Sequence, residues 1–282
     1  MPPSFKNSIL VLAGILSLNS CVNLKHVNKF AQSSVEGIEQ YDSLASSFTE
    51  ICYQNCEQEH IRQFKIHDIE CECGPDRRAD SITRLIYTTT KDYFYGLSDL
   101  SQNELTKYQA DDFTQTLATG NFGPLEMDEA DVKAYSDIST LLLRATTDAF
   151  RRKKLKQYVT QAHGPLLKLL HFLELNLTGS LNGKLEVQKS ELKDFYFDFI
   201  MDKQLSDYER IKFAEDYFRR TSEIEAQQET LSTYAEVLRE MVEGHTILYS
   251  NIGNMTDDEV RKTLGRHGRK LHGKISSFKT KE

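Results

Sequence analysis

Four cysteines have the spacing in this chain that most directly predicts chemistry. Cys52 and Cys56 are four residues apart in a stretch with helical periodicity, so they share one helix face with an axial offset of about 6 Å. Cys71 and Cys73 are two residues apart, and in an extended segment they also share a face, offset by about 6.6 Å. Because the offsets match, an antiparallel return of the chain pairs Cys56 with Cys71 and Cys52 with Cys73. The pattern predicts two disulfides across a hairpin.

A zinc site is the alternative interpretation of the same region. Cys52, Cys56 and His60 recur every four residues, and His67 stands close to the second cysteine pair. This spacing does not match the paired cysteines of the standard zinc modules. Free thiols are the third interpretation, and the choice depends on the compartment, because an oxidising one works against free thiolates.

The first 20 residues are typical of a signal peptide. They carry one cation, Lys6, then an apolar run over 9–16, then small and polar residues before Cys21. The run is shorter than the ~20 apolar residues that a membrane-spanning helix needs. We therefore expect residues 1–20 to be removed.

The end of this segment, Leu18-Asn19-Ser20-Cys21, resembles the lipobox of bacterial lipoproteins, although Asn is not the commonest residue before the serine position. The resemblance implies lipidation of Cys21 and a membrane anchor, since each buried methylene of an acyl chain contributes about 0.8 kcal/mol. Because Val22 follows the cysteine in place of Asp, an outer-membrane anchor with the body in the periplasm is expected. An ordinary secretory signal with a coincidental cysteine is the alternative. If Cys21 is lipidated, four cysteines remain, and this even number favours disulfides. We expect the hairpin that they join to lie near the membrane.

Composition predicts an all-α fold. The chain has only 14 Gly and 5 Pro in 282 residues, too few for the frequent turns of a β protein. Apolar periodicity predicts long helices over 23–60, 76–118, 128–159 and 190–251, and a short Leu-rich helix before the last of them. Breaks are expected at Gly74-Pro75, at 120–124, at Gly164-Pro165 and at 178–184. Short connections favour an elongated up-and-down bundle of about four long antiparallel helices over 21–255.

The Leu-rich segment has five leucines on one helix face, and two interpretations of it are open. The segment is either a helix buried in the bundle or an apolar surface that contacts lipid or a partner. In the second case, residues 128–251 look somewhat like the helical pore-forming toxins, whose apolar hairpin leaves the bundle on contact with lipid. The five residues are Leu166, Leu169, Leu170, Leu173 and Leu177.

Charge is unevenly distributed along the chain. The net charge is −7, yet residues 260–282 carry eight Lys and Arg residues against Glu282 alone. We expect a short helix and a flexible basic tail over 256–282, because three glycines punctuate it. The tail either contacts anionic lipid, lipopolysaccharide phosphate or an acidic partner, or it folds onto the acidic body. Its cations include Arg261, Lys262, Arg266, Arg269, Lys270 and Lys274.

Known catalytic motifs do not occur in the sequence. It has no HExxH, GxSxG, GxGxxG or CxxCH. We therefore expect no catalytic residues, no metal, no cofactor, no nucleic acid and no small-molecule substrate. The expected partners are a membrane, through the lipid anchor, and a protein of the cell envelope. The sequence thus predicts a non-enzymatic interaction or scaffold module, with a membrane-active protein and a metal-binding or enzymatic protein as alternatives.

Overall fold

The computed structural model describes residues 24–44, 46–65, 70–102, 104, 124–125, 127–145, 154–255 and 257–279. Over these residues the chain is helical and contains no strand, which confirms the all-α prediction. The elements are α1 (Lys25–Glu39), the 3₁₀ turn η1 (Gln40–Ser43), α2 (Phe48–Arg62), α3 (Gly74–Gln102), α5 (Glu129–Ala145), α6 (Leu155–Leu175), the π-helical turn η3 (Asn176–Leu181), α7 (Asn182–Met201), α8 (Asp207–Ser250) and α9 (Asp258–Lys279).

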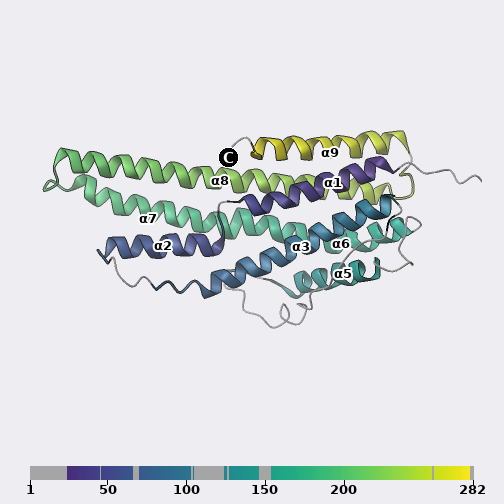
Figure 1. Ribbon diagram of the computed structural model, residues 1–282, viewed down its shortest axis with the longest axis horizontal. Coiled ribbons are helices and arrows are strands. Elements are labelled where there is room, and N and C mark those ends of the chain that lie inside the picture. The colour runs from purple at the N-terminus through teal and green to yellow at the C-terminus, as the bar shows by residue number, and fades with distance from the viewer. Residues whose placement is uncertain are drawn as a thin grey trace, which may run out of the picture.

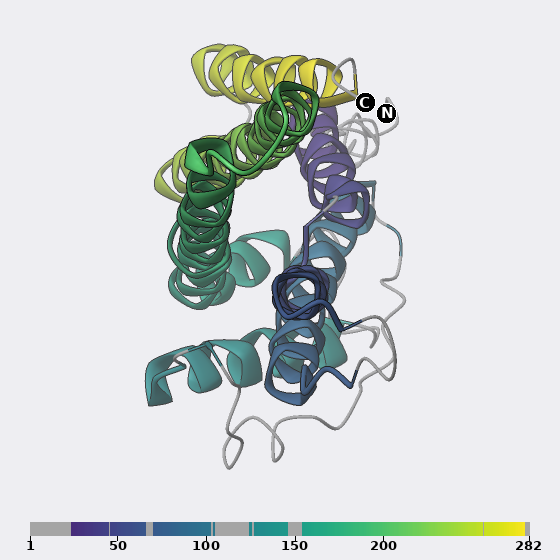
Figure 2. The ribbon, with the colours of Figure 1, turned by 90° about the vertical axis from the view of Figure 1, so that its left-hand side faces the viewer.

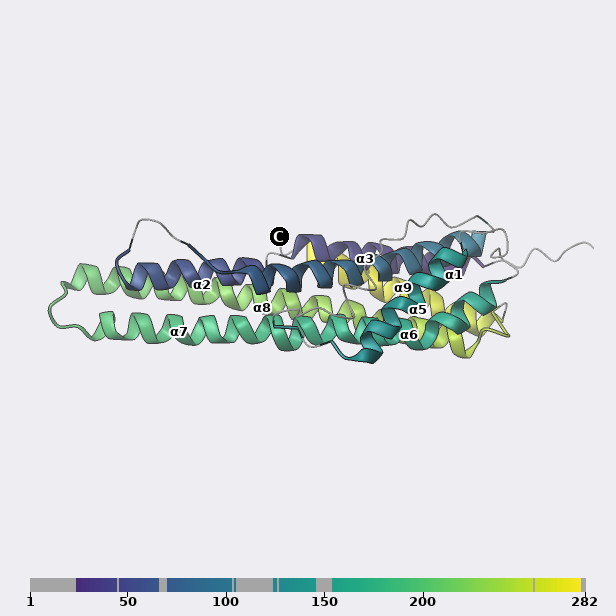
Figure 3. The same cartoon turned by 90° about the horizontal axis from the view of Figure 1, so that it is seen from below.

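The body is elongated and its two ends differ (Figure 1), and Figure 2 looks along the helices from the left-hand end of Figure 1. One end, which we call the base, holds the beginning of α1 and the end of α8, packed with α3, α5, α6 and α9. The other end, which we call the tip, is the hairpin of α7 and α8 over residues 195–220. Figure 3 shows that α2 lies alongside this hairpin and ends before it does. The 44 residues of α8 run the length of the molecule, about 66 Å at 1.5 Å per residue.

The main core lies in the base. Its largest fully buried side chains include the aromatic residues Tyr93 and Phe94 of α3 and Tyr158 of α6. A glycine permits the closest helix contact there, because a Cβ atom on Gly244 of α8 would collide with the ring of Phe30 on α1. This core fixes α1, α3, α6 and α8 relative to one another.

The predicted first helix over 23–60 is wrong as one element, since the chain forms α1 and α2 with a break between them. The break is stabilised from a distance, because the Asp80 carboxylate on α3 accepts hydrogen bonds from the backbone N–H groups of Phe48 and Thr49, each at 2.9 Å. Ser47 adds a local cap by accepting from the N–H of Glu50 at 3.1 Å. The capping bonds start a new helix where the periodicity alone would continue the old one.

The breaks expected at Gly164-Pro165 and at 178–184 are also wrong, because α6, η3 and α7 are continuous over residues 155–201. Buried leucines explain this continuity. They follow one another at four-residue steps, a spacing that drifts around an ideal helix of 3.6 residues per turn. The π-helical turn has more residues per turn and offsets the drift, so the leucines stay on one face. These residues are Leu173, Leu177, Leu181 and Leu185.

The real turn before the last long helix lies at 202–206. Ser206 there caps α8 and forms a reciprocal capping box with Glu209. The expected end of the second helix at 118 and most of the loop over 120–124 lie outside the described residues, as do Cys21 and the segment between α5 and α6. The expected number of long helices is thus only roughly right.

Candidate functional sites

The two predicted disulfides are confirmed. Cys52 is joined to Cys73 and Cys56 to Cys71, with Cα–Cα distances of 5.9 and 6.0 Å. All four sulfurs are therefore engaged, and the zinc interpretation loses its thiolate ligands. Both bonds tie α2 to the segment before α3. The hairpin lies away from the end of the body where α1 begins, since α2 points from the middle of the body toward the tip (Figure 1).

Helix α2 needs these bonds because its other contacts are weak. It buries only Phe48, Ile51 and Gln58. Against α7 and α8 it presents mainly amide and charged side chains, which line a polar cavity of about 330 Å³. The buried side chain of Gln58 accepts a hydrogen bond from Arg220 there. The disulfides thus hold a helix that apolar burial alone holds poorly.

The Leu-rich segment is buried in the base, which confirms the first of its two interpretations. The leucines at 166, 169, 170, 173 and 177 are at most 2% exposed. The second interpretation, in which these leucines contact lipid or a partner, is wrong for this fold. Among the described helices, none combines the length and the apolar content needed to cross a bilayer.

The flexible basic tail is also a wrong prediction, because residues 258–279 form the continuous helix α9. Its apolar face is buried against α1 and α8, which confirms the alternative that the tail folds onto its own body. The residues of this face recur at helical spacing, a signal present in the sequence despite the glycines. They are Val260, Leu264, Leu271 and Ile275.

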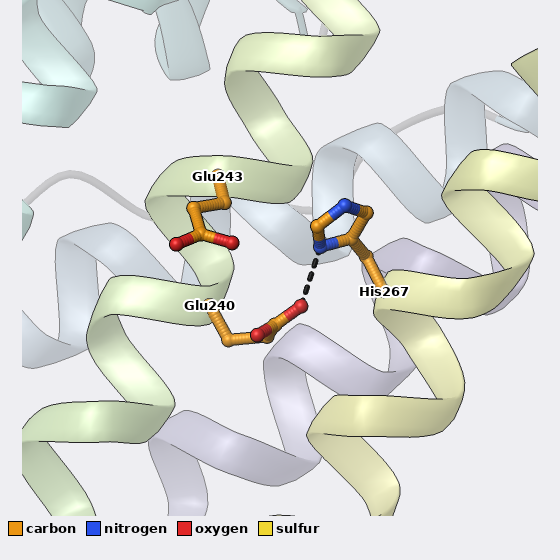
Figure 4. A group of neighbouring side chains, drawn as sticks. All are labelled: Glu240, Glu243 and His267. Carbon is orange, nitrogen blue, oxygen red and sulfur yellow. Dashed lines mark hydrogen bonds and ion pairs between the residues drawn. The ribbon is translucent and has the colours of Figure 1, made fainter.

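A polar cluster between α8 and α9 was missed at the level of sequence (Figure 4). The imidazole Nδ1 of His267 contacts the carboxylate of Glu240, and both side chains are buried. Lys270 Nζ lies 3.6 Å from the same carboxylate. The exposed Glu243 brings a second carboxylate, and the three ligand atoms lie within 4.8 Å of one another. One imidazole and two carboxylates suit a divalent cation, but Glu240 already contacts His267 and Lys270 of α9, so the cluster acts first as a link between α8 and α9.

A second buried polar group lies in the base core. His245 is fully buried, and its Nε2 and Nδ1 lie 2.7 Å from Tyr93 Oη and 3.2 Å from His163 Nδ1. Burial, with a smaller contribution from His163, lowers the pKa of His245 to about 3. The ring is therefore neutral and forms a hydrogen-bonded chain from α3 through α8 to α6. This chain of hydrogen bonds fixes the three helices relative to one another.

The tip has several large apolar side chains that are exposed to solvent. Along α8, Tyr208, Ile211 and Phe218 share one face and are 57–70% exposed. On α7, Phe197 and Met201 form a second stripe, one helical turn apart and about 60% exposed. Clusters of exposed aromatic residues are common in protein–protein contact surfaces. The tip is therefore the strongest candidate interaction surface.

Comparison with known proteins finds no matching family model, no matching curated protein and no matching solved structure. The candidate sites therefore rest on the sequence and the structure of this chain.

Proposed function

We propose that this protein is a membrane-tethered lipoprotein of a bacterial cell envelope. It acts as a non-enzymatic helical interaction module, lipidated at Cys21, that binds an envelope protein through its tip. The anchor part of the proposal comes from the sequence Leu18-Asn19-Ser20-Cys21. The outer membrane, with the body in the periplasm, is the proposed location.

The observation that carries the proposal is the position of the exposed tip at the opposite end of the body from the beginning of α1 (Figure 1). An anchor at Cys21 is three residues from Leu24, so it attaches to the base. The length of α8 then places its first residue, at the tip, about 66 Å from its last residue, in the base. A rigid helical body of this kind can present an apolar surface to a partner far from the membrane.

Two features of the tip support a protein partner. Phe199 of α7 packs against Phe195 of the same helix and against Phe213 of α8, yet Phe195 and Phe199 remain half-buried because the hairpin has only two helices there. A partner helix or sheet would cover one of the exposed stripes on the outer faces of the hairpin. Binding energy in such interfaces is concentrated in aromatic residues of this type.

The membrane-active alternative is less well supported. It depends on the Leu-rich segment, and Leu169, Leu170 and Leu173 are fully buried in the base. Release of this segment would break the core that holds α3 and α8. We expect no leakage from liposomes treated with the folded protein, and leakage that is lost with Leu170→Asn would favour the alternative.

The anchor is tested by intact-mass spectrometry of the native chain. We expect a chain that begins at Cys21 and carries three acyl groups, and a Cys21→Ala variant that lacks them. An unmodified polypeptide that begins at Met1 would rule out the anchor.

The docking role of the tip is tested by crosslinking in intact cells. A photo-crosslinking amino acid replaces Tyr208 or Phe197 at the tip, and the control replaces Leu143, an exposed apolar residue of α5 in the base. We expect one discrete protein adduct from both tip positions and none from the control. Equal crosslinking from all three positions, or none from the tip, would overturn the docking role without affecting the anchor.

A further inference from the structure

A basic groove runs between α1 and α9 at the base. The two helices are parallel and start at the same end of the body (Figure 1). Between them lies a groove of about 550 Å³. Its lining includes four cationic side chains and two imidazoles but one carboxylate, that of Glu36. The six basic groups are Lys25, His26, Lys29, Arg261, Arg269 and His272.

The cations of α9 divide between its two neighbours. On the side of α8, Lys274 Nζ lies 2.5 Å from Glu236, and Lys270 lies near Glu240. On the side of α1, the groove brings Arg261 and Arg269 toward the lysines of another helix. Arg261 has one acidic neighbour, Asp258 of its own helix at 3.1 Å, and that pair is largely exposed. The cations on the α8 side of α9 are thus paired with carboxylates of α8, while those on the α1 side lie near further cations.

Two of the groove's cations have no acid to neutralise them. Over the described ranges, no carboxylate lies within 4 Å of Lys29 or of Arg269, and the ion pairs of the groove involve Arg261 and His272 instead. Glu36, the acid of the groove, lies 3.8 Å from His272. The first turn of α1 also lacks an acidic residue, so the positive end of its helix dipole adds to the same field. Like charges gathered in this way repel one another unless an anion binds between them.

His26 gives an independent indication of a ligand. Its side chain is nine-tenths buried and lines the groove, yet its Nε2 atom has no hydrogen-bond partner in the part of the chain that the structure describes. Buried polar atoms of folded proteins are nearly always paired, so an unpaired nitrogen calls for an acceptor that the protein itself does not supply. Burial and the nearby Arg261 guanidinium lower the pKa of His26, so the neutral ring is favoured, and with its proton on Nε2 it would donate to an oxygen of a bound anion.

We propose that the groove between α1 and α9 binds a phosphate group, held by Lys29 and Arg269 and contacted by His26. Arginine and lysine are the usual phosphate ligands, and charge-assisted hydrogen bonds to phosphate are strong. The phosphate site rests on the groove alone. Its assignment to the headgroup of an anionic lipid rests on the proposed lipid anchor, because four residues from Cys21 to Lys25 span at most about 14 Å.

The test uses the mature chain with Cys21→Ser, so that no acyl group contributes to binding. Binding is measured to glycerol 3-phosphate in solution, to vesicles of phosphatidylcholine alone, and to vesicles of phosphatidylcholine with phosphatidylglycerol. The test variant is K29Q/R269Q, which removes two groove cations. The matched control is K262Q/R266Q, which removes two cations from exposed positions of α9 outside the groove.

We expect binding to glycerol 3-phosphate and to the anionic vesicles, and none to phosphatidylcholine. The K29Q/R269Q variant should lose roughly tenfold or more in affinity, and the control should lose less than about threefold, with thermal unfolding unchanged in both. Binding in solution without binding to vesicles would keep the phosphate site and assign it to a soluble ligand. Equal losses in the two variants, or no binding to any probe, would overturn the site, while intact-mass data on the anchor would stand unaffected.

Discussion

In the base, Tyr93 and Tyr158 stack with ring centroids 4.9 Å apart and are fully buried, while at the tip Tyr208 and Phe218 are about 70% exposed. Both regions are built from long helices rich in aromatic residues. The difference is the number of helices, because the base has neighbours on several sides of each helix and the tip has only two helices. A two-helix hairpin can bury one face of each helix. The aromatic residues that remain are available for a partner.

The two regions also differ in what holds them. In the base, apolar burial dominates, and some buried polar groups are hydrogen-bonded to one another, as His245 is to Tyr93. Toward the tip, ion pairs on the surface of α8, such as Arg219 with Glu223 at 2.7 Å, add little stability. There α2 depends on its disulfides. The free energy of unfolding should therefore be concentrated in the base.

Truncation of a core leucine should give the largest loss of stability. The Leu169→Ala variant leaves a cavity in the base and should lower the free energy of unfolding by about 3–4 kcal/mol. The matched control is Leu175→Ala on the same helix, where the side chain is 53% exposed and the loss should stay below about 1 kcal/mol. Urea unfolding measures both. Similar losses at the two positions would contradict the burial of this face of α6.

Removal of one disulfide should have the next largest effect. The Cys56→Ala/Cys71→Ala variant opens a loop of 15 residues and should lose about 3 kcal/mol in the chain-entropy model. The loss should be local, since α2 has few apolar contacts. Hydrogen exchange should become faster in α2 while α3 and α6 in the base keep their protection. Faster exchange across the base would show instead that α2 is part of the main cooperative unit.

Acid should weaken the base through His245. Its pKa is about 3 in the folded chain and 6.5 when unfolded, so the unfolded chain binds the extra proton as the pH falls below 6.5. The contribution of a neutral His245 to the free energy of unfolding is fully present above pH 6.5 and is lost progressively as the pH falls toward 3. Between pH 7.5 and 5.5 the loss from this group should be about 1.4 kcal/mol. Burial also lowers the pKa of His163, with the same sign. A His245→Asn variant should show a flatter dependence, and an unchanged slope would mean that other groups cause it.

Local spacing was enough to predict the disulfides, because both cysteine pairs are set by the rise per residue of a helix and of an extended segment. It was not enough for the break before α2, since Asp80 supplies the capping oxygens from more than 30 residues away in the chain. The all-α class followed from composition. A chain with few glycines and prolines favours helices, whichever way those helices then pack.

Local signals also failed where burial overrode them. Gly164, Pro165 and Gly179 all favour a break, yet the leucine face of α6 and α7 gains more from continuous burial than the helix loses. In α9 the glycines hid a regular apolar face, and spacing such as Val260 to Leu264 would have revealed it. The link between Glu240 and His267 joins residues 27 positions apart on two successive helices, beyond the range of a local pattern.

The smallest effect on stability is expected at the tip. The Tyr208→Ser variant removes an exposed side chain and should change the free energy of unfolding by less than about 0.5 kcal/mol, as measured by urea unfolding. The Phe199→Ser variant, in the half-buried aromatic contact with Phe213, should lose more, because its ring packs at a centroid distance of 4.8 Å. If the tip binds a partner, Tyr208→Ser should reduce the yield of a crosslink from Phe197 severalfold although the fold is intact. A large loss of stability with Tyr208→Ser would mean that this residue belongs to the folding core, and the contrast between base and tip would then fail.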